Sequence, residues 1–233
     1  MTDSYVALDI ETTGLNPAED AIIEIGAVRV EKGTAVDSYQ TFVNPGRPIP
    51  GRITQITGID DGMVCNAPSI DKLIKDVIEL TNGLPILGHN IIFDYSFLKK
   101  AASDCGMQFV RNGIDTCKLA RKILPDLPGK SLEYLCGYFG IDVRHHRALE
   151  DAKTALLIYK KLCAINDIGG HAEELVYRPP KKEPITAKQK SYLVSLIARY
   201  QVRFEKDVNA LTKSEASKAI DSIISTYGIP RRT

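Results

Sequence analysis

The sequence predicts an α/β fold in which a mixed β-sheet is flanked by helices, with a small helical unit after it. Patterns typical of strands and of amphipathic helices alternate over residues 4–165. A stretch rich in proline and charge follows at 177–184, and two capping-box sequences come after it. We therefore expect a domain over residues 1–170, a linker over 171–185 and a small helical domain over 186–233.

Three strands open the expected domain. Residues 4–10, 22–30 and 36–43 are enriched in Val, Ile and Tyr, and turn-forming residues separate them. Short connections between three consecutive strands favour an antiparallel meander. Ser69 is typical of a helix N-cap, and apolar residues recur at helical spacing from there to Ile78.

The second half of the domain alternates short buried strands with helices. Short apolar runs predict the strands, and apolar residues three or four apart predict the helices. The last helix carries the longest apolar stripe, from Leu149 to Leu162. The expected strands are 84–88 and 109–114, and the expected helices before the last are 93–102, 116–124 and 131–139.

Composition indicates a soluble globular protein of the cytoplasm. Apolar residues make up 44% of the chain and charged residues 25%, which is enough to bury a core. The five cysteines are odd in number and lack a C-x-x-C spacing, so we expect reduced thiols and neither disulfides nor a zinc site. The N-terminus does not resemble a signal peptide, and no apolar run approaches the ~20 residues that span a bilayer.

Charge is divided unevenly along the chain. Residues 1–177 hold 18 Lys+Arg and 24 Asp+Glu, a net charge of −6, whereas residues 178–233 hold 12 and 5, a net charge of +7. A basic segment of this kind suits an acidic partner such as nucleic acid, and it equally suits a solvated helical surface. The two C-terminal helices begin at the capping boxes that start with Thr186 and Thr212.

Acidic residues gather at three places where a metal ion could be held. Asp9 and Glu11 are two apart on a predicted strand, so their carboxylates point to one face and repel each other unless a cation lies between them. Asp94 begins a helix, and Asp151 lies in the first turn of another, five residues after His146. Two divalent ions held by oxygen ligands can bind a phosphodiester for in-line displacement, and an imidazole can accept the proton of the attacking water.

Some of these residues have rivals. Asp94 could serve only as a helix cap. Glu150 could take the place of Asp151, and His145 could take the place of His146, although the spacing favours Asp151 and His146.

Three stretches of the chain form a set of motifs. They are Asp9-Ile-Glu-Thr-Thr-Gly14, His89-Asn-x-x-Phe-Asp94 and His146-Arg-Ala-Leu-Glu-Asp-Ala152. In this order and spacing they resemble the motifs of the DEDDh exonucleases, with further similarity at 22–28 and 44–59. The resemblance covers about residues 4–165, and three motifs together are far more specific than any one of them. This family includes the proofreading 3′→5′ exonucleases, or epsilon subunits, of bacterial DNA polymerase III.

The resemblance implies an RNase H-like fold, two Mg²⁺ or Mn²⁺ ions, and release of nucleoside 5′-monophosphates from 3′ ends. By similarity, Asp9 would bridge both metals, while Glu11 and Asp151 would complete the first site. Asp94 would act on the second metal, largely through water, and His146 would be the general base.

The resemblance also implies residues that bind the substrate. Thr12 and Thr13 would hold the terminal nucleotide, and Leu15 could wedge beneath the last base. Arg144 and Arg147 could contact phosphate or could be surface charges. The residues expected to line the same pocket are His89, Asn90 and Phe93.

The sequence therefore predicts a metal-dependent 3′→5′ exonuclease that acts on single-stranded DNA or unpaired 3′ ends, in proofreading or repair. One alternative is a 3′→5′ exoribonuclease, and another is a non-catalytic module that binds nucleic acid or a polymerase. The C-terminal helices would either hold nucleic acid through phosphate contacts or bind a polymerase subunit or a helicase.

Overall fold

The computed structural model describes residues 3–142, 147–166, 172–177 and 183–228. The chain divides into two compact units, Met1–Arg178 and Pro179–Thr233. The division falls inside the segment expected to be a linker, 171–185. The first residues of that segment nevertheless belong to the first unit, because Glu173–Glu174 pairs with its sheet.

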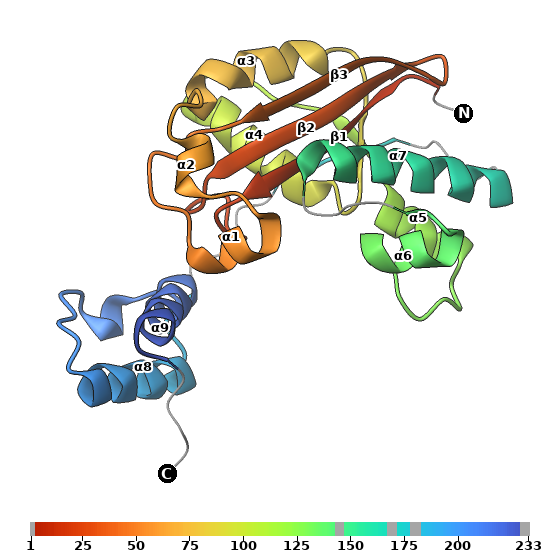
Figure 1. Ribbon diagram of the computed structural model, residues 1–233. Coiled ribbons are helices and arrows are strands. Elements are labelled where there is room, and N and C mark those ends of the chain that lie inside the picture. The colour runs from red at the N-terminus through yellow and green to blue at the C-terminus, as the bar shows by residue number, and fades with distance from the viewer. Residues whose placement is uncertain (1–2, 143–146, 167–171, 178–182, 229–233) are drawn as a thin grey trace. The chain divides into compact units, whose positions relative to one another are not determined.

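The first unit contains a sheet that is mixed, as predicted, with the strand order β3-β2-β1-β4-β5-β6 (Figure 1). The sixth strand, β6, was not predicted, because it has only two residues and lies in the expected linker. The first three strands form the expected antiparallel meander. β4 runs parallel to β1, β5 runs parallel to β4, and the short β6 is antiparallel to β5. The strands are β1 Tyr5–Thr12, β2 Ile22–Glu31, β3 Thr34–Phe42, β4 Ile86–Gly88, β5 Asn112–Asp115 and β6 Glu173–Glu174.

Most of the helices lie where the apolar spacing predicts them. Ser69 occupies the N-cap position of α3 as expected, although its side chain makes no capping hydrogen bond. Two helices, α1 and α2, were not predicted, because they are too short for a periodic apolar stripe and follow a segment rich in proline and glycine. The helices are α1 Gly51–Thr57, α2 Asp61–Val64, α3 Ile70–Leu80, α4 Ile92–Asp104, α5 Thr116–Ile123, α6 Leu132–Phe139 and α7 Ala148–Ile165.

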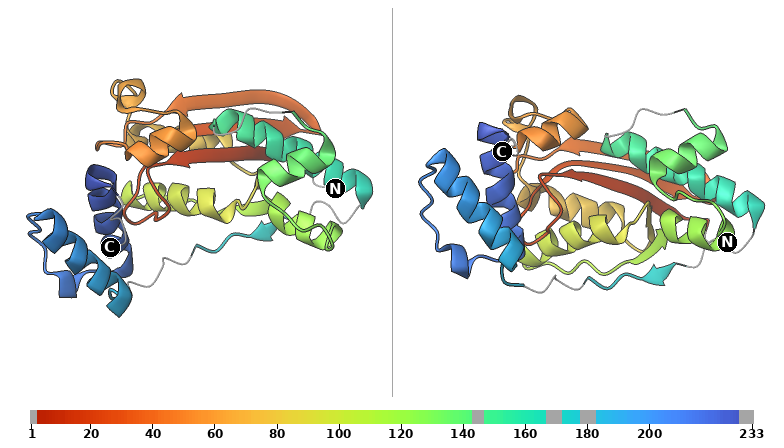
Figure 2. Two further views of the ribbon diagram at one scale, coloured as in Figure 1. Left: turned by 60° about the horizontal axis from the view of Figure 1, so that its bottom comes forward. Right: turned by 90° about the horizontal axis from the view of Figure 1, so that it is seen from below.

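The sheet is covered on both faces, with α7 on one side and α3 and α4 on the other (Figures 1 and 2). Alternate residues of β1 point to opposite faces. Val6, Leu8 and Ile10 join a buried cluster with side chains of α3 and α4. Tyr5 and Ala7 join a second cluster with side chains of α7. The central strand is therefore fixed by apolar packing on both faces.

The first turn of α7 lies directly on β2 at Gly26. A Cβ atom at Gly26 would be 2.1 Å from the backbone nitrogen of Leu149, so any side chain there would overlap the helix backbone. Gly26 is paired with Asp9 of β1. The missing side chain thus brings the start of α7 beside the strand that carries the first predicted acids.

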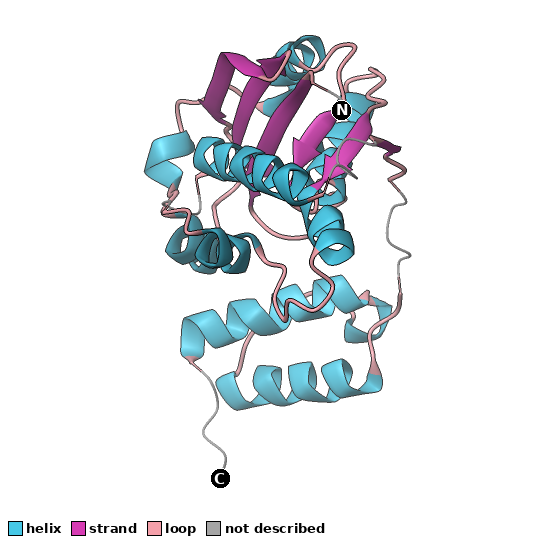
Figure 3. Cartoon of the chain, turned by 90° about the vertical axis from the view of Figure 1, so that its right-hand side faces the viewer, coloured by secondary structure: helices cyan, strands magenta, loops and turns pink. Residues whose placement is uncertain are grey.

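The second unit is helical in the part that the structure describes (Figure 3). It has its own apolar core. It contains α8 Ala187–Tyr200, the 3₁₀ helix η1 Val208–Ala210 and α9 Lys213–Tyr227. Both predicted capping boxes form, with Thr186 and Gln189 at the start of α8 and Thr212 and Glu215 at the start of α9. Among the described residues of the whole chain, none of the helices combines the length and apolar composition needed to cross a bilayer.

Gly26→Ala should lower the free energy of unfolding by about 1–3 kcal/mol, because the added methyl group overlaps the backbone of α7. Denaturant titration of the full chain measures this change. Gly137→Ala in α6 is the matched control, because a Cβ there meets open space, and it should be neutral or stabilising. A Gly26→Ala variant as stable as the Gly137→Ala variant would show that α7 does not need this close approach.

Candidate active site

Three acidic side chains meet where β1 ends under α7. Asp9 and Glu11 lie on the face of β1 that α7 covers, as their spacing predicts. Asp151 lies in the first turn of α7. One carboxylate oxygen from each of Asp9, Glu11 and Asp151 lies within 4.8 Å of the other two. Asp9 and Glu11 are partly buried and Asp151 is buried, so the group borders the surface without being fully exposed.

Asp94 reaches the same strand from α4. It lies in the first turn of that helix and is 3% exposed. Its Oδ1 accepts a hydrogen bond of 3.0 Å from the backbone N–H of Ile10, the residue between the two acids of β1. Asp94 is therefore held beside Asp9, although it is not one of the three acids whose oxygens lie within 4.8 Å.

The acids disfavour one another's ionised forms. Burial raises the pKa of Asp9 well above its usual value, and the charges of Asp94 and Asp151 raise it further. Burial, followed by the charge of Asp151, raises the pKa of Glu11 to about 7. Burial also raises the pKa of Asp94, against the hydrogen bond from Ile10. A divalent cation would offset this repulsion, and carboxylate oxygens are the ligands that Mg²⁺ and Mn²⁺ prefer. The donor set therefore fits such a metal.

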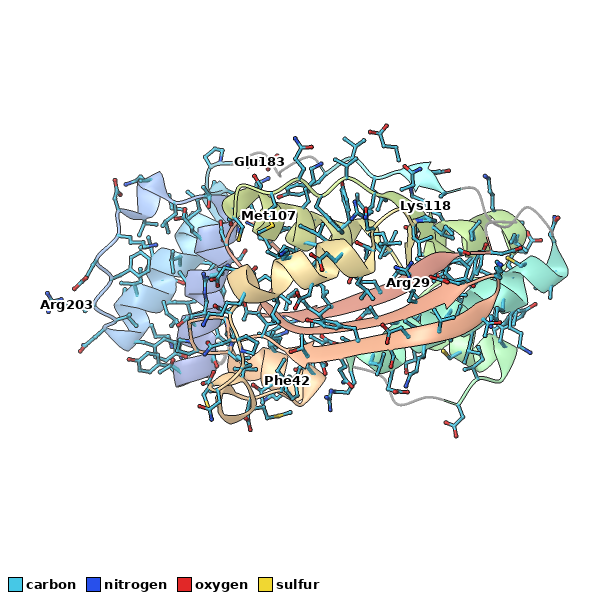
Figure 4. The ribbon with its side chains drawn as sticks, turned by 90° about the horizontal axis from the view of Figure 1, so that it is seen from above. Arg29, Phe42, Met107, Lys118, Glu183 and Arg203 are labelled. Atoms are coloured by element: carbon cyan, nitrogen blue, oxygen red, sulfur yellow. The ribbon has the colours of Figure 1, made fainter. Side chains whose placement is uncertain are left out.

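An ion pair that the sequence did not reveal lies next to this group. Glu24 of β2 is fully buried and accepts hydrogen bonds from the Arg147 guanidinium, the shortest at 2.8 Å. The guanidinium also lies over the ring of Phe42. Phe42 is the last residue of β3 (Figure 4). Arg147 was expected to contact phosphate or to be a surface charge, whereas the structure pairs it with Glu24. The available signal was a lone acid inside the apolar run Ile22-Ile23-Glu24-Ile25.

The turn that follows Glu11 is internally braced. The Thr12 hydroxyl donates to the Gly14 carbonyl at 2.6 Å, and the Thr13 hydroxyl accepts from the Ala21 N–H at 2.9 Å. Both threonine side chains are buried, and these hydrogen bonds use their hydroxyl groups within the turn. Leu15 is 84% exposed on the same turn, which leaves an apolar side chain free to contact a ligand.

The other predicted pocket residues lie around the end of β4. His89 Nδ1 is 2.9 Å from the Thr116 hydroxyl, and burial lowers the pKa of His89. Asn90 is exposed with a φ of +63°, and its N–H donates to Asp115 Oδ1. Phe93 packs at the edge of the α3 and α4 core, with its ring centroid 5.1 Å from that of Phe97. His89 and Phe93 thus have structural contacts of their own, and the substrate-binding roles of these residues stay predictions.

The predicted general base lies outside the described residues. His146, its rival His145 and Arg144 fall in the segment 143–146, and the described chain resumes at Arg147. The other rival, Glu150, is on the surface and pairs with Lys153 at 2.8 Å.

A mixed sheet with acids at the end of its central strand and at the starts of two helices defines the class of nucleases with an RNase H-like fold. The exonuclease family RNase_T, described as "Exonuclease", matches residues 6–159. The chain belongs to this exonuclease family. The predicted resemblance to the DEDDh exonucleases is therefore confirmed.

Several curated relatives are DNA polymerases III of the PolC type. The chain is 42% identical over 167 residues to that of Caldanaerobacter subterraneus subsp. tengcongensis, covering 71% of this chain and 12% of the polymerase. It is 31% identical over 238 residues to that of Pediococcus pentosaceus, covering 94% of this chain and 17% of the polymerase. The chain thus spans a small part of the length of these relatives.

Solved exonuclease structures share the fold. Exonuclease X in complex with 5′ overhanging duplex DNA matches with a TM-score of 0.57 and 28% identity, covering 73% of this chain and 96% of that one. Exonuclease I matches with a TM-score of 0.65 and 18% identity, covering 71% of this chain and 42% of that one. The predicted RNase H-like fold is confirmed.

Asp9→Asn should stabilise the metal-free protein at pH 8 and have a smaller effect at pH 5. The pKa of Asp9 is raised on folding, so its carboxyl group favours the folded state below its unfolded pKa of about 3.9 and opposes folding once pH rises through the folded pKa. The pKa of Glu11 is also raised, to about 7. Ionisation of Glu11 therefore lowers the stability of the folded protein as pH rises through neutrality.

Thermal unfolding in chelator at the two pH values measures this difference. Asp104→Asn is the control, because Asp104 is an exposed carboxylate paired with Lys100. A lower midpoint for Asp9→Asn than for wild type at pH 8 would mean that Asp9 supports the fold.

Proposed function

We propose that this chain is a metal-dependent 3′→5′ exonuclease that hydrolyses the last phosphodiester bond of single-stranded DNA or of an unpaired 3′ end, releasing nucleoside 5′-monophosphates. The observation that carries the proposal is the convergence of Asp9, Glu11 and Asp151 within 4.8 Å, with Asp94 held against the same strand. Membership of the exonuclease family and the similarity to PolC-type polymerases support it. Exonuclease X, solved with 5′ overhanging duplex DNA, supports DNA as the substrate.

The acids would hold two Mg²⁺ or Mn²⁺ ions. Bound there, such a pair activates a water and stabilises the leaving oxygen of a phosphodiester. Asp9 would bind both ions, Glu11 and Asp151 would complete the first site, and Asp94 would serve the second, largely through water. The hydrogen bond from Ile10 to Asp94 would keep that carboxylate in position between turnovers.

Other side chains would hold the strand and move the proton. His146 would accept the proton of the attacking water, since an imidazole titrates close to neutral pH. Leu15, exposed on a braced turn, would lie beneath the last base. Thr12 and Thr13 would shape the turn that receives the terminal nucleotide, with their hydroxyl groups engaged inside it. Phe93, His89 and Asn90 would border the same pocket.

End-labelled strands test the proposal. With Mg²⁺ or Mn²⁺, a 3′-labelled DNA strand should release labelled mononucleotide at once, and a 5′-labelled strand should shorten stepwise. Chelator should stop both, and Asp151→Asn should fall to the level seen with chelator. Glu150→Gln is the matched control and should retain turnover, because its side chain pairs with Lys153 at the surface.

Three outcomes would redirect the proposal. Faster shortening of RNA than of DNA would favour the exoribonuclease alternative. No product with either metal would favour a non-catalytic module that binds nucleic acid or a polymerase. His146→Ala should reduce turnover by ~10²–10⁴, and loss of turnover in His145→Ala instead would move the general base to His145.

We also propose that the second unit holds single-stranded nucleic acid through one side of α8. Lys188, Tyr192 and Arg199 are exposed and are spaced by four and seven residues, which places them on one side of the helix. Cations contact phosphates and an exposed tyrosine can stack on a base. Arg203, which is also exposed, extends from the loop after α8 (Figure 4).

The variant Lys188→Ala/Tyr192→Ala/Arg199→Ala in the full chain should bind a DNA oligomer more weakly. The slope of log affinity against log salt should become shallower by about 0.7 for each phosphate that the variant no longer neutralises. Lys72→Ala/Lys75→Ala, on the exposed side of α3, is the charge control. Unchanged affinity and slope in the α8 variant would favour a unit that binds a polymerase subunit or a helicase.

A further inference from the structure

We propose that Glu24 and Arg147 are positioning residues: the ion pair between the fully buried Glu24 and the partly exposed Arg147 sets the place of the first turn of α7 and thereby holds Asp151 at the distance from Asp9 and Glu11 that the metal site requires. The inference rests on the proposed function, since it concerns the same metal site. Neither residue needs to contact the metal or the strand for this role.

Glu24, on β2, makes several hydrogen bonds that fix the start of α7, although the two lie far apart in the sequence. Arg147 Nε lies 3.2 Å from each Glu24 carboxylate oxygen, and Nη2 lies 2.8 Å from Oε1. The backbone N–H of Ala148 donates to Oε2 at 3.1 Å. Gln40 Nε2 donates to Oε1 at 2.9 Å from the neighbouring strand. Both oxygens of a fully buried carboxylate are therefore used.

Glu24 takes the place of a local helix cap. Arg147 is the N-cap residue of α7, and its own side chain makes no capping hydrogen bond. The first N–H groups of a helix need an acceptor, and a negative charge near them is favourable. Glu24 supplies both from β2, so α7 begins at the point in space that the sheet dictates.

Asp151 lies one helical turn after Arg147, the residue that Glu24 holds in place. Its backbone N–H donates to the Arg147 carbonyl at 3.0 Å, in the first hydrogen-bonded turn of α7. A shift of Arg147 would therefore move Asp151 with it. Because Gly26 lies two residues after Glu24 and lets the helix backbone touch the sheet, one strand provides both the close approach and the anchor.

Stability alone does not explain a pair of this kind. Glu24 is fully buried, whereas the Arg147 side chain is 40% exposed. Taking a carboxylate such as that of Glu24 out of water costs free energy, and buried ionic groups are better attested as devices that select one arrangement. Arg147 also directly follows His146 in the sequence, so the segment that carries the predicted general base ends at the anchored residue.

Arg147→Gln gives the sharpest test, because the two explanations predict opposite signs. If the guanidinium acted only through its charge, removing it would strengthen Mn²⁺ binding to the nearby acids. If it positions α7, its removal should weaken Mn²⁺ binding by ~10–100-fold, the usual effect of losing a residue that orients a metal ligand. Calorimetric titration of the full chain with Mn²⁺ measures this affinity directly.

Glu24→Gln should weaken Mn²⁺ binding similarly, with a fall in kcat and a smaller change in KM for the DNA strand. Arg147→Lys keeps the charge but not the two-pronged contact and should give an intermediate loss. Glu31→Gln is the matched control, because it breaks the partly exposed Arg29–Glu31 pair on the same strand and should leave Mn²⁺ affinity unchanged.

Tight Mn²⁺ binding in a folded Arg147→Gln variant, equal to or stronger than wild type, would overturn the inference. If either single variant fails to fold, the double variant Glu24→Gln/Arg147→Gln replaces it, because that variant leaves no unpaired buried charge. Weaker Mn²⁺ binding in the folded double variant would support the inference. Wild-type affinity would overturn it. A wild-type chain that binds Mn²⁺ but releases no nucleotide would count against the proposed function only, because the Mn²⁺ comparison still decides this inference.

Discussion

Mutual repulsion between carboxylates is the constraint around which this protein is built. Asp9, Glu11 and Asp151 approach within 4.8 Å, and Asp94 is buried beside them. Such a group opposes folding when every member is ionised. Apolar packing on the two faces of β1 offsets this repulsion. It fixes the strand that carries two of the acids between α7 on one side and α3 and α4 on the other.

Two different kinds of contact bring Asp151 of α7 close to the acids of β1. Gly26 acts by shape, since only a residue without a side chain lets the backbone at Leu149 lie on β2. Glu24 acts by charge and hydrogen bonding, since it caps α7 and pairs with Arg147. The close approach at Gly26 by itself would allow α7 to shift or rotate on the sheet. Hydrogen bonds to the Glu24 carboxylate are directional, so they define where the first turn of α7 lies.

The sequence predicted the features that repeat along the chain and missed those that depend on contact between distant residues. The two-residue spacing of Asp9 and Glu11 was sufficient to place both on one face, and long apolar stripes were sufficient to locate α7. The Glu24–Arg147 pair joins residues separated by 123 positions, so no local pattern reveals it. The hydroxyl groups of Thr12 and Thr13 also form their bonds within a folded turn, which spacing in the sequence does not encode.

The placement of the acids carries a cost in stability that a bound cation would offset. Asp94 accepts a hydrogen bond from Ile10, but it is also buried beside other carboxylates, and burial and the charge of Glu11 both raise its pKa. Stability would be served better by apolar or amide side chains at these positions. A divalent cation would reverse the balance, because each acid that opposes folding alone would become a ligand in its presence. The fold thus accepts a local instability that a bound cation would remove.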